Sequence, residues 1–119
     1  MSRRAPILIL LALGACAPAA EAPPQPVALD CARGFDALVQ AVAAQPGFVE
    51  AQAPGEPYRY INAEDGRTSY VVTREGAPGH PAIVRQAGGR TTGCGYGEKA
   101  GYDQLLAYLE SLSQARRTN

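Results

Sequence analysis

The residues best suited to chemistry in this chain are three cysteines and one histidine. The thiols belong to Cys16, Cys31 and Cys94, and the single imidazole belongs to His80. A thiolate can act as a nucleophile, bind a metal or form a disulfide, and an imidazole can exchange a proton near neutral pH. Because an odd number of cysteines cannot all pair within one chain, one of the three needs a separate explanation.

The residues before Cys16 follow the order of an export signal. Two arginines precede the apolar run Ile7–Leu13, and the small residues Gly14 and Ala15 come after it. A charged, then apolar, then small-residue order is typical of a secretory signal. A helix that spans a bilayer needs about 20 apolar residues, so this run is too short to be one. The sequence therefore predicts export and a mature protein with no transmembrane helix.

The tetrapeptide Leu13-Gly14-Ala15-Cys16 resembles the lipobox of bacterial lipoproteins. The resemblance implies a signal peptide over residues 1–15, cleavage before Cys16, a diacylglycerol group on its sulfur and an acylated amino terminus. Two or more acyl chains give stable anchoring, whereas one chain binds reversibly. Since Ala17 follows the cysteine in place of Asp, the resemblance also implies the outer membrane of a Gram-negative cell, facing the periplasm. An ordinary secretory signal with an incidental cysteine is the alternative.

Lipidation of Cys16 leaves Cys31 and Cys94 as a pair. Export places both in an oxidising compartment, so we predict a disulfide between them. Closing a loop of that length stabilises a fold by about 4 kcal/mol on the chain-entropy model. Two unpaired buried thiols are the alternative. A metal site is disfavoured, because two cysteines and one distant histidine fall short of four ligands.

A glycine-rich stretch, three tyrosines and His80 are the candidate partner surface. Gly93, Gly95 and Gly97 alternate along a strand and so share one face. If Cys94 points toward the helices, the glycines point away from them and leave a bare groove on an open side of the sheet. Such a groove admits the backbone of a partner. A twisted or bulged edge strand is the alternative.

The tyrosines are the second part of this surface. Tyr58 and Tyr60 share a strand face, and Tyr70 is expected opposite them. On an open face they would suit recognition, and under a helix they would be core. His80 lies in the loop Gly76–Pro81 with no carboxylate nearby in sequence, so a plain loop residue is favoured over a catalytic or pH-sensing one.

No motif identifies a reaction or a cofactor. The glycine spacing fits no dinucleotide or phosphate loop, and the serines fit no nucleophile motif. We therefore predict no catalytic residue, no cofactor and no metal. Removal of the two signal-peptide arginines leaves nine basic against eleven acidic residues, a net charge of −2. Without a basic stripe, nucleic acid is not an expected partner.

Hydrophobic periodicity and turn chemistry define the elements that position these residues. Helical spacing of apolar residues predicts one helix from Phe35 to the Pro46-Gly47 stop, with Asp30 as a nearby N-cap, and another over Tyr102–Leu112. Strand-forming residues between turn signals predict four strands, over Tyr58–Ile61, Thr68–Arg74, Ala82–Gln86 and Arg90–Tyr96.

The order α-β-β-β-β-α predicts an α+β fold. We expect a two-layer sandwich, in which two helices pack on a four-stranded antiparallel sheet. The expected organisation is a signal peptide over 1–15, a lipidated cysteine and Pro/Ala-rich tether over 16–29, one domain over 30–115 and a polar tail over 116–119. The prolines of the tether favour extended geometry.

These features favour a membrane-anchored envelope lipoprotein that acts as a non-enzymatic binding or accessory module for a periplasmic protein or peptide. One alternative is a periplasmic inhibitor of a cell-wall hydrolase, which would present the loop Gly76–Pro81. The other is an enzyme that uses His80 in a pocket with a carboxylate or tyrosine.

Overall fold

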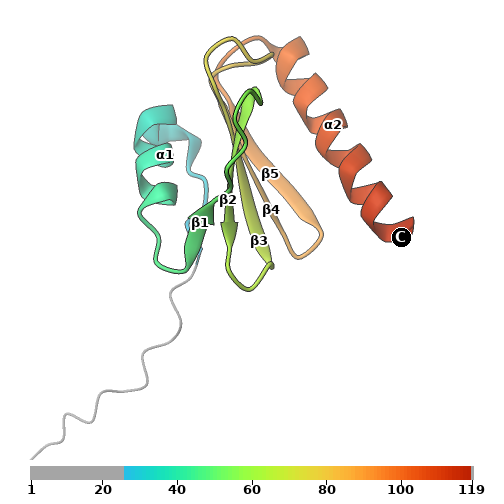
Figure 1. Cartoon of the computed structure of the whole chain (residues 1–119). Coiled ribbons are helices and arrows are strands. Elements are labelled where there is room, and N and C mark those ends of the chain that lie inside the picture. The colour runs from blue at the N-terminus through green and yellow to red at the C-terminus, as the bar shows by residue number, and fades with distance from the viewer. Residues whose placement is uncertain (1–25, 119) are drawn as a thin grey trace, which may run out of the picture.

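Two helices lie on opposite faces of one antiparallel sheet in the computed structural model, which describes residues 26–118 (Figure 1). The elements in chain order are η1 (Cys31–Arg33), α1 (Phe35–Ala43), β1 (Phe48–Glu50), β2 (Tyr58–Ala63), β3 (Thr68–Thr73), β4 (Ala82–Ala87), β5 (Arg90–Gly95) and α2 (Lys99–Thr118). The five strands lie side by side in that order, and each neighbouring pair is antiparallel. The predicted α+β class and the helix–strands–helix order are confirmed.

The structure has one strand and one layer more than we expected. The additional strand, β1, has only three residues and pairs Phe48 with Ala63 and Glu50 with Ile61. Such a short segment after a Pro-Gly turn carries almost no periodic signal. The additional layer arises because α1 covers one face of the sheet and α2 covers the other (Figure 1). The arrangement is therefore helix, sheet, helix, in place of two layers.

The central strands are buried on both faces because strand side chains alternate between faces. In β3, Tyr70 and Val72 belong to the hydrophobic cluster under α1, whereas Val71 belongs to the cluster under α2. In β4, Ile83 and Val84 divide in the same way. Uninterrupted apolar runs are typical of strands that are covered on both sides.

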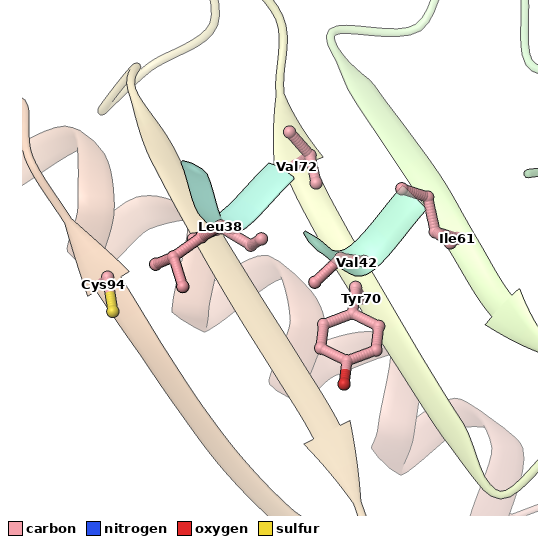
Figure 2. Close-up of a cluster of buried hydrophobic side chains, with 7 residues drawn as sticks. Leu38, Val42, Ile61, Tyr70, Val72 and Cys94 are labelled. Carbon is pink, nitrogen blue, oxygen red and sulfur yellow. The ribbon is translucent and has the colours of Figure 1, made fainter. Parts of the chain in front are cut away.

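The cluster under α1 gathers the helix, the sheet and the disulfide-bonded strand around one core. Figure 2 shows Leu38 and Val42 of α1 above side chains from β2, β3 and β5. The buried members of this cluster are Leu38, Val42, Ile61, Tyr70, Val72, Ile83 and Cys94. Burial of Leu38 alone removes an amount of apolar surface that stabilises the fold by about 2 kcal/mol.

The packed domain begins a few residues earlier than the expected boundary at Asp30. The backbone N–H of Val27 donates to Gln45 Oε1 at 2.7 Å, and the Tyr70 hydroxyl donates to the Val27 carbonyl at 2.6 Å. Asp30 caps η1, the short helix just before α1, by accepting a hydrogen bond from the Ala32 N–H at 3.0 Å. Residues 27–29 therefore belong to the fold, whereas the predicted tether had included them.

At its other end, the domain continues to Thr118, because α2 extends through the segment that we expected to be a polar tail. The predicted signal peptide over residues 1–15 and the predicted lipidation site at Cys16 lie outside the described residues. Within the described range 26–118, no helix has the length and apolar character needed to cross a membrane.

Candidate functional site

A disulfide joins Cys31 of η1 to Cys94 of β5, as predicted. The bridge spans 63 residues of sequence and ties the segment before α1 to the last strand. Next to it, the Tyr96 hydroxyl donates to the Cys31 carbonyl at 2.7 Å. Because disulfides persist in oxidising compartments, this bridge is consistent with an extracytoplasmic location.

The glycine face of β5 is occupied, in contrast to the bare groove that we expected. A Cβ atom at Gly95 would lie 2.7 Å from the ring atoms Cγ and Cδ1 of Tyr102, and one at Gly93 would also meet Tyr102. Tyr102 comes from α2, the helix that covers this side of the sheet. The glycines therefore make room for an aromatic ring of the same chain, and they do not present an empty surface to a partner.

The third glycine of the series takes part in a backbone contact that we call the glycine junction, formed by Gly79, Gly97 and Gly101. A Cβ at Gly79 would lie 2.7 Å from the backbone carbon of Gly101. A Cβ at Gly97 would lie 2.7 Å from the carbonyl oxygen of Gly79. The loop before β4, the loop after β5 and the start of α2 thus meet at a separation that only glycine allows.

The tyrosines do not share one face. Tyr70 pairs with Ile61 and lies, fully buried, under α1, whereas Tyr58 and Tyr60 lie on the side of α2. Our expectation that Tyr70 lies opposite the other two failed because the strand register places it one residue out of phase with them. Tyr70 is therefore core, and it cannot contribute to a partner surface.

Tyr58 and Tyr60 form a small cluster with Tyr108 of α2. The rings of Tyr58 and Tyr108 stack with centroids 6.0 Å apart. Burial, aided by a hydrogen bond with Tyr108, raises the pKa of Tyr60 to about 12. Burial also raises the pKa of Tyr58. Tyr108 itself remains 41% exposed and forms the outer surface of this cluster.

His80 is half-buried and bonds to a hydroxyl instead of a carboxylate. Its Nδ1 lies 2.7 Å from Thr73 Oγ1, which in turn accepts a hydrogen bond from the Ala82 N–H at 2.9 Å. The ring packs edge-on against Phe35 with centroids 5.5 Å apart. These contacts connect the loop Gly76–Pro81 to β3 and α1, and they orient no nucleophile.

A groove between the sheet and the second half of α2 is the best candidate for a binding site. This sheet–helix groove encloses about 330 Å³. Its lining comes from the sheet and from α2 and comprises Ala51, Tyr60, Asn62, Ser69, Val71, Gln86, Leu109, Leu112 and Arg116.

The sheet–helix groove has a polar floor and an apolar wall. Asn62 pairs with Ser69 across β2 and β3, and Ser69 pairs with Gln86 across β3 and β4, so the three side chains form one row. Within residues 26–118, none of these three side chains forms a hydrogen bond. Leu109 and Leu112 of α2 face this row. The groove therefore offers free donors and acceptors beside apolar surface, as ligand sites commonly do.

Sequence reasoning missed this groove, although a signal for it exists. Along β3 and β4, the face toward α2 changes from apolar Val71 and Val84 to polar Ser69 and Gln86 two residues away. A polar residue at an otherwise apolar period-2 position indicates a place where the core ends. The helical spacing of Leu109 and Leu112 predicts a core position for them and gives no sign of a groove.

The described residues supply no metal site, since no three His, Cys, Asp or Glu side chains among them converge. In comparisons with known proteins, no family model matches the chain, and no curated protein or solved structure shows significant similarity to it. The geometry of the chain itself therefore carries the argument on function.

Proposed function

We propose that this chain is an outer-membrane lipoprotein whose domain faces the periplasm on acyl chains attached to Cys16. The observation that supports this proposal is the pairing of cysteines. The bridge between Cys31 and Cys94 accounts for two of the three cysteines. The remaining cysteine, Cys16, is the last residue of the lipobox-like tetrapeptide, and attachment of a lipid accounts for its lack of a disulfide partner.

Mass spectrometry of the protein extracted from bacterial membranes tests the anchor. We expect a chain that starts at Cys16 and carries acyl groups, and a Cys16→Ser variant that is found in the fraction without membranes. A chain that keeps Met1, or one with an unmodified thiol at Cys16, would contradict the proposal. Cleavage with an unmodified thiol would indicate an ordinary secretory signal.

We further propose that the domain is a non-enzymatic binding module, which takes an extended protein or peptide segment in the sheet–helix groove. The free Asn62, Ser69 and Gln86 side chains suit the amide groups of a peptide backbone, and Leu109 and Leu112 suit an apolar side chain. The contacts of His80 with Thr73 and Phe35 favour a structural role for the one imidazole over a catalytic one.

Photocrosslinking in living cells tests this site. A photoactivatable benzoylphenylalanine replaces Ala51, which is exposed and lines the groove, or Ala107, which is exposed on α2 outside the groove. We expect a discrete crosslinked product from position 51 and none from position 107. Equal crosslinking from both positions would show that the groove is not the binding surface.

The two alternative functions have less support from the geometry. An inhibitor would project the loop Gly76–Pro81, but Gly79 packs against the backbone of α2 and Ala77 is buried. Assays of lysozyme-type hydrolases with and without the protein test this alternative directly. An enzyme would need His80 to have a catalytic partner other than Thr73. A His80→Gln variant with the same cellular phenotype as the wild type would remove that hypothesis.

A further inference from the structure

Four arginines converge at one end of the molecule, from three different elements. Arg67 follows the β2–β3 turn, Arg90 begins β5, and Arg116 and Arg117 lie in the last turn of α2. All four are exposed and line one hollow of about 180 Å³. We call this group the arginine end. Hydroxyl and amide groups of Ser69, Gln86, Thr91 and Ser113 line the same hollow.

None of the four arginines of the arginine end forms an ion pair with another residue of the range 26–118. Among residues 26–118, ion pairs join Arg59 to Glu50 and Lys99 to Asp103, and neither pair belongs to this end. Glu110 is the one carboxylate in the lining, and its Oε1 accepts a hydrogen bond from Gln114. The β2–β3 turn beside this end contains Glu64 and Asp65. The Asp65 carboxylate accepts a hydrogen bond from the Arg67 backbone N–H at 2.8 Å.

Helix termini explain only part of this charge. Arg116 and Arg117 lie in the last turn of α2, where their charges interact favourably with the negative end of the helix dipole. Arg67 is the last residue before β3 and Arg90 is the first residue of β5, so no helix dipole acts on either of them. A hollow lined by four arginines and by hydroxyl side chains suits the oxygens of a phosphate group.

The arginine end is also the end from which the chain leads back toward Cys16. The lower end of Figure 1 contains the β2–β3 and β4–β5 turns, the C-terminal end of α2 and the start of the described chain. Val27, near the start of the described chain, is held by two hydrogen bonds. It accepts one from the Tyr70 hydroxyl and donates one to the Gln45 side chain. Ten residues of chain, 16–25, can span at most about 35 Å. A lipid on Cys16 therefore attaches the domain to a bilayer from this end.

We propose that the arginine end binds the phosphate of anionic phospholipid headgroups, so that the anchored domain lies with this end on the membrane. The inference rests on the proposed lipid anchor for its geometry. Opposite charge and proximity to the anchor both favour a headgroup as the occupant. Headgroup contacts of this kind weaken as salt screens them.

Hydrogen exchange on the membrane-extracted protein, reconstituted in vesicles, tests the proposal. We expect the amides of residues 64–67, 88–91 and 113–117 to exchange more slowly in vesicles that contain phosphatidylglycerol than in phosphatidylcholine alone, with the difference lost at high salt. The pair R116Q/R117Q should abolish the difference. The matched pair R33Q/K99Q, which removes two charges from η1 and from the start of α2, should keep it.

Three outcomes would overturn the proposal. They are equal exchange in both kinds of vesicle, equal effects of the two charge pairs, and the same protection by inorganic phosphate without vesicles. The last outcome would assign the hollow to a free anion.

A Cys16→Ser variant separates this inference from the anchor itself. We expect it to sediment with phosphatidylglycerol vesicles and not with phosphatidylcholine vesicles. R116Q/R117Q in that background should weaken binding about 25-fold, from about fivefold for each arginine near an anionic surface. Binding by this variant together with an unmodified Cys16 in the native protein would uphold the arginine end and reject the anchor. No binding, with a lipidated native protein, would do the reverse.

Discussion

At the scale of single residues, the contact between Gly95 and Tyr102 has the clearest energetic consequence. A methyl group at Gly95 would overlap the Tyr102 ring, which α2 holds in place. We expect Gly95→Ala to destabilise the domain by about 1–3 kcal/mol, as overpacking commonly does. Urea denaturation followed by circular dichroism measures this loss.

The Tyr102→Ala background provides the control for that prediction. Without the ring, the new methyl group has room, and alanine is the better residue in a strand. Gly95→Ala should then be neutral or stabilise the domain by about 0.5 kcal/mol. An equal loss of stability in both backgrounds would show that the ring is not the cause.

Tyr60 predicts how stability depends on alkaline pH. Its pKa is about 12 in the folded state, because burial and Tyr108 disfavour the phenolate. The pKa of a tyrosine in an unfolded chain is about 10. Between these values the folded state keeps a proton that the unfolded state releases, so stability is full below about pH 10 and falls as pH rises toward about 12.

The measurement is urea denaturation at about pH 8 and about pH 11. Tyr60→Phe has no proton to lose at this position, so its stability should fall less between the two pH values than that of the wild type. The buried Tyr58 contributes in the same direction in both proteins. Identical losses in the two proteins would mean that Tyr60 is not the titrating group.

At the scale of elements, the β4–β5 turn shows which glycine is required. Gly88 and Gly89 have φ angles of 58° and 78°, which matches a two-residue turn with both central residues left-handed. Asparagine tolerates the first position of such a turn. We expect Gly88→Asn to change stability by less than about 0.5 kcal/mol and Gly89→Ala to cost about 1 kcal/mol. Thermal melts would contradict this if the two variants behaved alike.

The elements were largely predictable from sequence, because periodicity and turn residues are local. β2 to β5 and both helices were found near their observed positions. β1 was not, since its pairing depends on β2 and not on its own three residues. The two-sided cover of the sheet was also missed, although the unbroken runs at Tyr70–Val72 and Ala82–Val84 are the pattern that such cover requires.

At the scale of the whole molecule, the disulfide ties the beginning of the domain to its last strand. Its 63-residue span predicts a stabilisation of about 4 kcal/mol through the unfolded chain. The double variant C31A/C94A should lose about that much in urea denaturation, and a reductant should have no further effect on it. A loss below about 1 kcal/mol would show that the bridge contributes little.

The candidate site was less predictable than the fold, because it depends on contacts between distant segments. The alternation of Gly93 and Gly95 predicts a bare groove, whereas the ring of Tyr102, from a distant segment, fills that face. Likewise, the arginines of the arginine end are separated by up to 50 residues, from Arg67 to Arg117, and only the fold collects them. Net charge, which is summed over the chain, conceals such a local excess.

The packing of α2 against the sheet differs along its length. Its first turns are held by the glycine junction and by the buried Leu105 and Leu109, whereas its last turns lie over two hollows. From Leu109 to Thr118 the helix measures about 14 Å, at about 1.5 Å per residue. Arg116, in this last part, lines both the sheet–helix groove and the hollow of the arginine end. A ligand bound in either place therefore changes the surroundings of a side chain that belongs to the other.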